Sequence, residues 1–301
     1  MKKSIQRVAF KLEENSGYNA DIQIVPTGIY YSNYWNFRSK LYVCFGKPLS
    51  LKDYIEDYKQ DPAKTMLKLG NVLHEKISEQ IINIKDLKTH DEYDFLLEVY
   101  DKYIAEKLLI NNIKDLGNKI IVDKETVRML DELKDKKPED FNSLMDDART
   151  YSEGLKKFKL KDWVLEKTEL SNKLFRKILL LIIAVPIYIY GALNNIIPYF
   201  LPRLITKGLK DRQFESSIVY GLGIITFPIF YLLQSYIVLL LTNSFIYAGI
   251  YLISLPVFGL LAFIYSRLYV KTSAQIRFNR NKKTDGMKNL INLRERIIAK
   301  I

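Results

Sequence analysis

The sequence predicts an incomplete α/β layer, followed by a helical module and an α-helical multi-pass membrane region. Two runs without any charged side chain, residues 178–202 and 216–266, carry the membrane part of this prediction. The second run has 51 residues, whereas about 20 apolar residues cross a hydrocarbon core. Most of residues 1–176 have helical spacing and many charges, and strand patterns occur only near residues 20–45.

Residues 1–84 contain the strand patterns. The spacing of Ile5, Val8, Ala9 and Leu12 predicts a helix over residues 2–15, closed by Ser16-Gly17. Strands are predicted at Ala20–Tyr31 and Leu41–Phe45, and helices at 51–58 and 61–84. The first strand is apolar enough for burial on both faces, which requires neighbouring strands and covering helices. Residues 1–84 therefore form only part of an α/β layer.

Residues 85–176 are predicted to form a helical module. Leu96, Tyr100, Ile104 and Leu108 recur every four residues, and a further helix starts at Pro138, in the first turn where proline is tolerated. Residues 156–177 lead from this module into the membrane region, 177–266.

The long uncharged run contains one turn, Thr242-Asn-Ser244, which divides it into transmembrane helices 218–241 and 245–265. Basic residues flank this hairpin on both ends, so both ends are expected in the cytoplasm. They are Arg203, Lys207, Lys210 and Arg212 before it, and Arg267, Lys271, Arg277, Arg280, Lys282 and Lys283 after it.

The shorter run, 178–202, allows two interpretations. A single crossing would export the basic residues on both sides of the hairpin, against the positive-inside rule. Pro186, Gly191, Asn194-Asn195, Pro198 and Pro202 also interrupt it. Breaks at membrane depth are tolerated where protein covers the backbone. We therefore predict a re-entrant or interfacial hairpin rather than a full crossing.

The tail, 267–301, has ten basic and two acidic residues and supplies +8 of the net charge of +12. It is interpreted as a basic cytoplasmic tail whose charge either flanks the membrane span or attracts anionic lipid. It has no nucleic-acid recognition motif and follows a span directly, so no nucleic-acid partner is predicted.

Known catalytic motifs are missing. The sequence has no phosphate-binding glycine loop, no nucleophile elbow and no metal motif. His74 lies on an amphipathic helix and His90 in a charged connector, so both are expected to be solvated side chains. The single cysteine, Cys44, excludes an internal disulfide and agrees with a cytosolic location of the charged half. No signal-peptide pattern occurs at the N-terminus.

Two blocks separated by a short turn stand out in residues 24–48. They are Ile24-Val-Pro-Thr-Gly-Ile-Tyr-Tyr31 and Leu41-Tyr-Val-Cys-Phe-Gly-Lys-Pro48, with Asn36-Phe-Arg-Ser39 between them. This order resembles the bacterial 1-acyl-glycerol-3-phosphate acyltransferases of the glycerolipid acyltransferase superfamily. Lys2–Phe10 is similar to the helix that follows the phosphate-binding Pro-Glu-Gly block of this family. Two later segments are similar to features of a long, membrane-extended form: Tyr151–Leu155 with Leu160–Asp162, and Asn195–Pro202.

The resemblance implies a general base, a His-x4-Asp pair, and a Pro-Glu-Gly block for the acceptor phosphate. Neither occurs here: Glu79 stands five residues after His74, and Phe95 five after His90. The chain is therefore expected to be the C-terminal portion of such an enzyme, truncated at the N-terminus and inactive alone. No cofactor or metal is implied, and the co-substrate would be an acyl-CoA or acyl-carrier-protein thioester.

The resemblance also suggests substrate-binding residues. Val25, Pro26 and Gly28 would shape the wall of the acyl-acceptor site, or mark only a bent strand end. Arg38 would pair with a substrate phosphate, since a guanidinium binds phosphate bidentately, and Lys47 would act similarly. As surface residues of a turn, both need no function.

The sequence leaves two possible functions open. The first is a membrane-bound glycerophospholipid acyltransferase that acts on lysophosphatidate or a similar lysolipid. The second is a non-catalytic membrane-anchored protein, or a partner subunit of a split acyltransferase whose N-terminal fragment comes from a neighbouring reading frame. Both place the protein in the cell membrane with its N-terminal domain and C-terminal tail cytoplasmic.

Overall fold

The computed structural model describes residues 4–33, 38–166, 171–208 and 214–300. The predictions on Lys2, Lys3, Asn36, Phe37, Lys210 and Arg212 lie outside these ranges. The chain divides into two compact units, one of residues 1–153 with 292–301 and one of residues 154–291. Each is described by itself.

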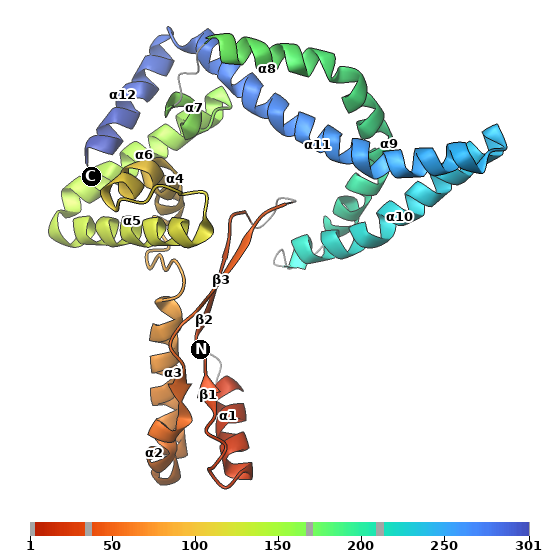
Figure 1. Cartoon of the computed structure of the whole chain (residues 1–301). Helices are drawn as coiled ribbons and strands as arrows, with labels where there is room; N and C mark the ends of the chain where they lie inside the picture. The colour runs from red at the N-terminus through yellow and green to blue at the C-terminus, as the bar shows by residue number, and fades with distance from the viewer. Residues whose placement is uncertain (1–3, 34–37, 167–170, 209–213, 301) are drawn as a thin grey trace. The chain divides into compact units, whose positions relative to one another are not determined.

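The strands of the first unit form an interrupted antiparallel hairpin (Figure 1). The strands are β1 (Gln23–Ile24), β2 (Thr27–Tyr31), β3 (Leu41–Phe45) and β4 (Leu49–Ser50). β2 pairs with β3 and β1 with β4. Pro26 and Pro48 lie in the interruptions, because proline cannot donate to a ladder. The predicted single strand 20–31 is thus two short strands.

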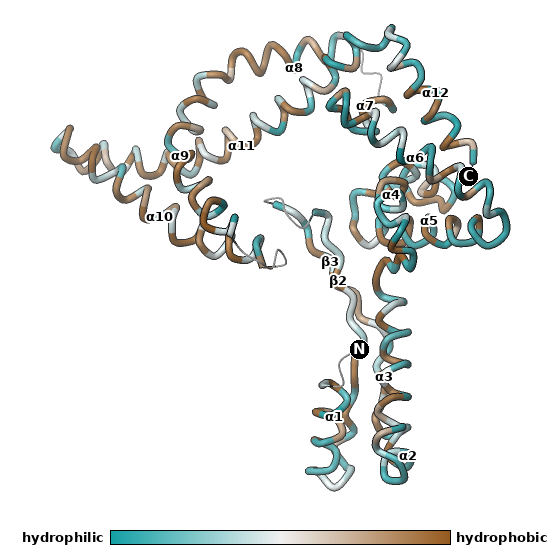
Figure 2. Tube along the Cα trace, turned by 180° about the vertical axis from the view of Figure 1, so that it is seen from behind, coloured by the Kyte–Doolittle hydropathy of each residue, from teal (hydrophilic) through white to brown (hydrophobic). Residues whose placement is uncertain are grey.

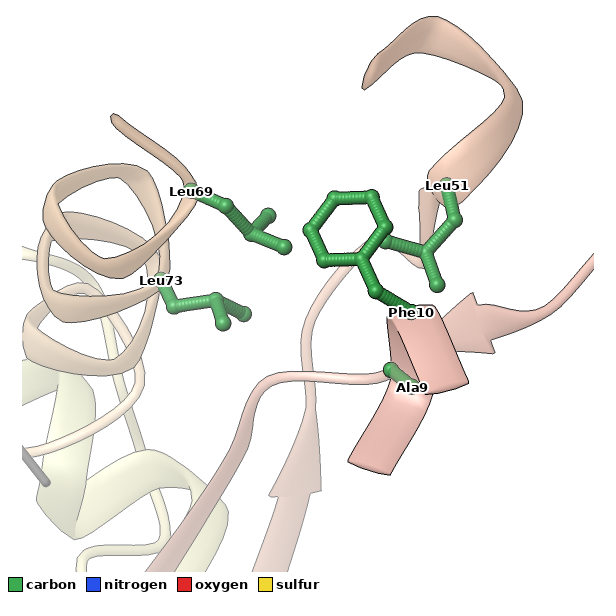
Figure 3. Packing of buried hydrophobic residues seen from close by; sticks show 5 residues of the cluster. All are labelled: Ala9, Phe10, Leu51, Leu69 and Leu73. Carbon is green, nitrogen blue, oxygen red and sulfur yellow. The ribbon is translucent and has the colours of Figure 1, made fainter. Parts of the chain in front are cut away.

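Three helical segments accompany the hairpin and provide a small core. They are α1 (Ser4–Asn15), η1 (Leu51–Tyr54) with α2 (Ile55–Gln60), and α3 (Pro62–Ser78). Ala9, Phe10, Leu51, Leu69 and Leu73 pack together as Figure 3 shows. Gly17 adopts a φ of 64° after α1, which confirms the predicted helix end. The helix predicted to reach residue 84 ends at Ser78.

The apolar stripe of α1 does not face this core. Ile5, Val8 and Leu12 are 53, 60 and 51% exposed, whereas Gln6 and Glu13 are buried beside Ala9 and Phe10. The helix is present as predicted, and of the four residues whose spacing predicted it only Ala9 is buried. Figure 3 shows that the side chain of Phe10 points into the core, and no described element covers the opposite stripe.

The helical module of the first unit contains α4 (His90–Lys107), α5 (Leu116–Lys136) and most of α6 (Pro138–Phe158). Its buried residues include Leu96, Tyr100 and Ile104, which confirms the predicted spacing. The last part of α12 (Asp285–Ala299) belongs to this unit as well. Arg296 and Lys300 pair with Asp147 at 3.0 and 3.3 Å. The second half of the predicted tail is therefore docked as a helix.

The second unit contains two helices long and apolar enough to span a membrane, α10 (Glu215–Thr242) and α11 (Phe245–Asn281). Asn243 in a left-handed conformation joins them, which confirms the predicted turn. α7 (Asp162–Glu166) precedes them. Figure 2 shows apolar residues along α10 and the first part of α11. α11 extends 16 residues beyond the predicted end of the span at residue 265.

The shorter apolar run forms α8 (Ser171–Ile183) and α9 (Val185–Thr206). The two helices are bent by 55° at their junction, an angle that fits a broken span or a re-entrant segment. Helix α9 continues through Asn194, Asn195, Pro198 and Pro202, where we expected interruptions. Only Pro186 coincides with a break, at the first turn of α9.

Helix α9 packs against both apolar helices with the opposite chain direction. As the residue number rises along α9, the number of the residue that it contacts falls, both on α11 and on α10. Against α11 the contacts are Tyr188–Tyr265, Tyr190–Phe258 and Asn195–Leu255; against α10 they are Asn194–Gln234, Asn195–Tyr231 and Pro198–Thr226. Since α10 and α11 run in opposite directions, α9 must cross between two splayed helices, as Figure 1 shows.

Candidate functional site

The two sequence blocks that stood out lie opposite each other in the hairpin. Gly28 faces Cys44 in the strand register, and the amide of Gly46 donates to the carbonyl oxygen of Pro26 at 2.7 Å. Both glycines approach Gln80, just after α3. A Cβ atom on Gly28 would overlap the Gln80 carbonyl group, so only glycine fits there. Pro26 and Gly28 are buried, and Val25 is exposed.

The two predicted phosphate-binding residues are not brought together. Arg38 lies in the hairpin turn with a φ of 62°, beyond the pair Tyr31–Leu41. Lys47 follows the opposite end, beyond the pair Thr27–Phe45. Four residues of strand separate these pairs, roughly 13 Å at the usual rise. Both side chains are exposed, and they cannot bind the same phosphate.

A buried charged cluster connects the hairpin to the helical module. The Tyr30 hydroxyl donates to Asp123 at 2.8 Å, and the Lys119 ammonium contacts both Asp101 and Asp123. These residues come from β2, α5 and α4, and the Asp123 side chain is 1% exposed. We name Tyr30, Asp101, Lys119 and Asp123 the hairpin clamp. Motif spacing could not reveal it, because its members are spread over 93 residues.

Burial dominates the electrostatics of the hairpin clamp. It raises the pKa of Asp101 to about 6 and also raises that of Asp123, despite the nearby ammonium of Lys119. Burial would lower the pKa of Lys119, but the two carboxylates raise it overall. Burial and the neighbouring Asp123 raise the pKa of Tyr30. One cation thus faces two carboxylates, which leaves the clamp with an excess negative charge when all groups are ionised.

The histidines and the cysteine occupy ordinary positions. His74 is exposed on α3. His90 is the first residue of α4 rather than part of a connector, and its Nδ1 lies 3.6 Å from Asp94 Oδ2. Both side chains are solvent-accessible, and the distance exceeds that of a hydrogen bond. Cys44 is half-buried with its Sγ 3.0 Å from the Gln80 carbonyl oxygen.

A second polar cluster lies among the apolar helices α9, α10 and α11. The Asn195 side chain accepts from the Tyr231 hydroxyl at 2.6 Å and donates to the Gly191 and Leu255 carbonyl oxygens. Asn194 accepts from Tyr251 at 2.6 Å through its side chain and from Gln234 at 3.0 Å through its carbonyl. We name these two asparagines with Tyr231, Gln234 and Tyr251 the intramembrane cluster.

Small residues let the helices approach closely around the intramembrane cluster. A Cβ atom on Gly259 would lie 2.8 Å from Asn195 Oδ1, and one on Gly191 would overlap the Phe258 carbonyl oxygen. Small residues together with hydrogen-bonding side chains are the usual means of helix association in lipid. The cluster is uncharged and its groups hydrogen-bond to one another, so the arrangement holds α9 against the hairpin helices.

Neither cluster is a metal centre. Across the described residues, no group of three histidine, cysteine or acidic side chains could hold a metal ion. No family model, no curated protein and no solved structure matches the chain. Fold and sites define a mostly helical protein with two helices able to span a membrane.

Proposed function

We propose that this chain is the C-terminal, membrane-anchored portion of a glycerophospholipid acyltransferase. Such an enzyme transfers an acyl group to lysophosphatidate or a similar lysolipid: an ester C–O bond forms, the thioester C–S bond breaks, and the hydroxyl proton leaves with the thiol. The observation that carries the proposal is the register of the hairpin, because it pairs the Val25-Pro-Thr-Gly28 block with the Phe45-Gly-Lys-Pro48 block.

The exposed face of the hairpin supports an incomplete domain. Ile29 and Val43 are cross-strand partners that are 54 and 37% exposed, and the flanking Tyr31, Leu41 and Phe45 are exposed on the same face. A two-stranded hairpin is marginally stable alone, and apolar sheet faces normally pack against another layer. The exposed stripe of α1 adds to this exposed apolar surface.

The catalytic base would come from the polypeptide that covers this face. His74 and His90 have no aspartate five residues later, and the aspartate four residues after His90 is not within hydrogen-bond distance. A general base must reach the proton that it removes. We therefore propose that the chain alone is inactive and that Val25, Pro26 and Gly28 contribute the wall of an acceptor site completed by its partner.

We also propose a membrane topology. In this topology the α8–α9 segment begins and ends on the same side of the membrane and does not cross it. The segment 292–301 packs in the same unit as residues 1–153, which supports a placement of both on one side of the membrane. If α10 and α11 each cross once, the stretch before them would cross an even number of times. This argues against a single crossing by α9.

Two further observations support this topology. Helix α9 crosses between the splayed α10 and α11 instead of lying parallel to either, as described above. Arg203 lies in its last turn and Lys207 directly follows it, and the positive-inside rule favours a cytoplasmic location for such a basic helix end. The protein would thus be a multi-pass membrane protein with both termini cytoplasmic.

An activity assay with two polypeptides tests the function. Membranes containing this chain alone are expected to form no phosphatidate from lysophosphatidate and acyl-CoA or acyl-carrier protein. Addition of the polypeptide encoded directly upstream should restore the product if it carries His-x4-Asp and Pro-Glu-Gly, and replacement of that histidine by alanine should abolish it. Phosphatidate formed by this chain alone would overturn the inactivity. An upstream sequence without both motifs would favour the alternative, a non-catalytic membrane-anchored protein.

A further inference from the structure

A basic cleft opens on the helical module, away from the hairpin clamp. Its volume is about 270 Å³, and it lies among α4, α5, the start of α6 and the C-terminal segment. Five cations and one carboxylate line it. They are Lys107, Arg128, Lys136, Lys137 and Lys300, with Glu132.

Internal ion pairs neutralise only part of this charge. Arg128 contacts Glu125 and Glu132, Lys136 lies 3.3 Å from Glu132, and Lys300 pairs with Asp147. Among the described residues, no carboxylate lies within ion-pair distance of Lys107 or Lys137. The Lys107 ammonium lies 3.9 Å from the Met129 sulfur and also interacts electrostatically with Glu125. Two ammonium groups without an ion-pair partner on one cleft favour an anionic ligand, because such pairs are charge-assisted hydrogen bonds.

The floor of the cleft is apolar. Ile104, Leu130 and Leu144 line it and are at most 3% exposed. Tyr100 also lines it, but its hydroxyl is occupied by the Ile297 carbonyl oxygen at 2.9 Å. A ligand that reaches the floor would therefore meet hydrocarbon rather than free polar groups. A cationic rim over an apolar floor suits a molecule with one anionic and one apolar part.

From these features we infer that the basic cleft binds a phosphate-bearing amphiphile: a phosphate group held by Lys107 and Lys137, with the beginning of an acyl chain over Ile104 and Leu130. The volume is slightly below the roughly 300–1,000 Å³ of pockets for drug-sized ligands. It admits a phosphate and a short length of chain, so most of the ligand stays outside. The ligand is either a lysophosphatidate from the membrane or an acyl-CoA from solution.

The C-terminal segment is one wall of the site. Lys300 lines the cleft, and the Tyr100–Ile297 hydrogen bond holds the segment in place. The site would therefore exist only while residues 292–301 are docked. This inference does not depend on the proposed acyltransferase function, since it concerns binding by this chain alone.

Binding to the full chain in phosphatidylcholine nanodiscs tests the inference by calorimetric titration. The probes are palmitoyl-lysophosphatidate, palmitoyl-CoA, glycerol 3-phosphate and inorganic phosphate, with lysophosphatidylcholine and empty nanodiscs as blanks for partitioning. At least one phosphate-bearing amphiphile should bind about tenfold or more tightly than the two chain-free phosphates. Which amphiphile binds identifies the source of the ligand.

Two variants separate the cleft from general surface charge. Lys107→Ala/Lys137→Ala should weaken amphiphile binding about tenfold or more, because both cations contact the phosphate. The matched control, Lys88→Ala/Lys114→Ala, removes two exposed lysines outside the cleft and should bind like the unmodified chain. Equal binding by the cleft variant would overturn the inference. So would failure of both amphiphiles to bind, or equally tight binding of inorganic phosphate.

Discussion

The hydroxyl of Tyr100 donates a hydrogen bond of 2.9 Å to the carbonyl oxygen of Ile297, which lies 197 residues later in the chain. Both apolar helices, α10 and α11, are encoded between these two residues. The hydrogen bond therefore joins segments that precede and follow the membrane region. The proposed topology depends on this relationship, because two segments joined by a direct hydrogen bond would lie on the same side of the membrane.

Single cysteines should report that topology. In a Cys44→Ser background, Lys207→Cys and Lys283→Cys are expected to react with a membrane-impermeant maleimide only from the cytoplasmic side. Ser244→Cys, in the turn between α10 and α11, should react only from the opposite side. Labelling of intact spheroplasts and inverted vesicles measures this. Reaction of position 207 from the same side as position 244 would show that α9 crosses fully.

The hydrogen bond between Asn195 and Tyr231 should couple α9 to α10. We expect a coupling energy of about 0.6–1.7 kcal/mol, because interhelical hydrogen bonds in membrane proteins contribute about this much. A double-mutant cycle with Asn195→Ala and Tyr231→Phe, measured by unfolding in mixed micelles, provides the value. Tyr236→Phe serves as the control, since Tyr236 is 59% exposed on the same helix. A coupling near zero would contradict the proposed role of the intramembrane cluster.

Lys119 should matter more for stability than either of its partners. Lys119→Met would leave the buried Asp123 and the half-buried Asp101 without a cation and is expected to lower the free energy of unfolding by about 3–5 kcal/mol. Asp101→Asn leaves a balanced Lys119–Asp123 pair and should lower it by no more than about 1 kcal/mol. Denaturant unfolding followed by circular dichroism compares the two. A larger loss for Asp101→Asn would refute this charge balance.

Asp101 should also make stability depend on pH. Its pKa rises from 3.8 to about 6 in the folded chain, so the folded state binds more protons than the unfolded state between about pH 4 and 6. The contribution of Asp101 to stability is therefore largest below pH 4, falls as the pH rises through this window, and is constant above it. Asp101→Asn should remove this slope. If the free energy of unfolding of the variant depends on pH as before, another group causes this dependence.

The exposed hairpin face should promote self-association when its partner is missing. Ile29→Thr/Val43→Thr keeps β-branched residues in a cross-strand pair and reduces apolar exposure, so the purified chain should associate less without losing stability. Analytical ultracentrifugation in detergent measures association. Tyr30→Phe is the contrasting variant, because Tyr30 lies on the covered face and its hydroxyl bonds Asp123; it should lower stability and leave association unchanged.

Local sequence pattern was sufficient to predict several parts of the fold. Gly17 ended the first helix and Asn243 joined the two apolar helices as predicted, because both steps depend on backbone conformations that few residues favour. The orientation of α1 was not predictable. Its spacing identified an apolar stripe, but spacing cannot tell whether another element covers that stripe, and none does among the described residues.

The candidate sites, too, were predictable from the sequence only in part. The blocks around Gly28 and Gly46 were evident in the sequence, and the structure pairs them across the hairpin. The separation of Arg38 from Lys47 was not evident, because strand register decides it. The sequence predicts helix interruptions at Asn194 and Asn195, because a single sequence does not show that Tyr231 and Tyr251 satisfy their side chains within a continuous helix.

Composition, run length and spacing established that this chain has a charged part, an apolar hairpin long enough to span a bilayer and no recognisable catalytic motif. The clustering of Tyr30, Lys119 and two aspartates, and the return of the C-terminal segment to the first unit, became evident only from the folded chain. Desolvation and hydrogen bonding act between residues that are close in space, and the pairs Tyr30–Asp123 and Tyr100–Ile297 lie 93 and 197 residues apart in the chain.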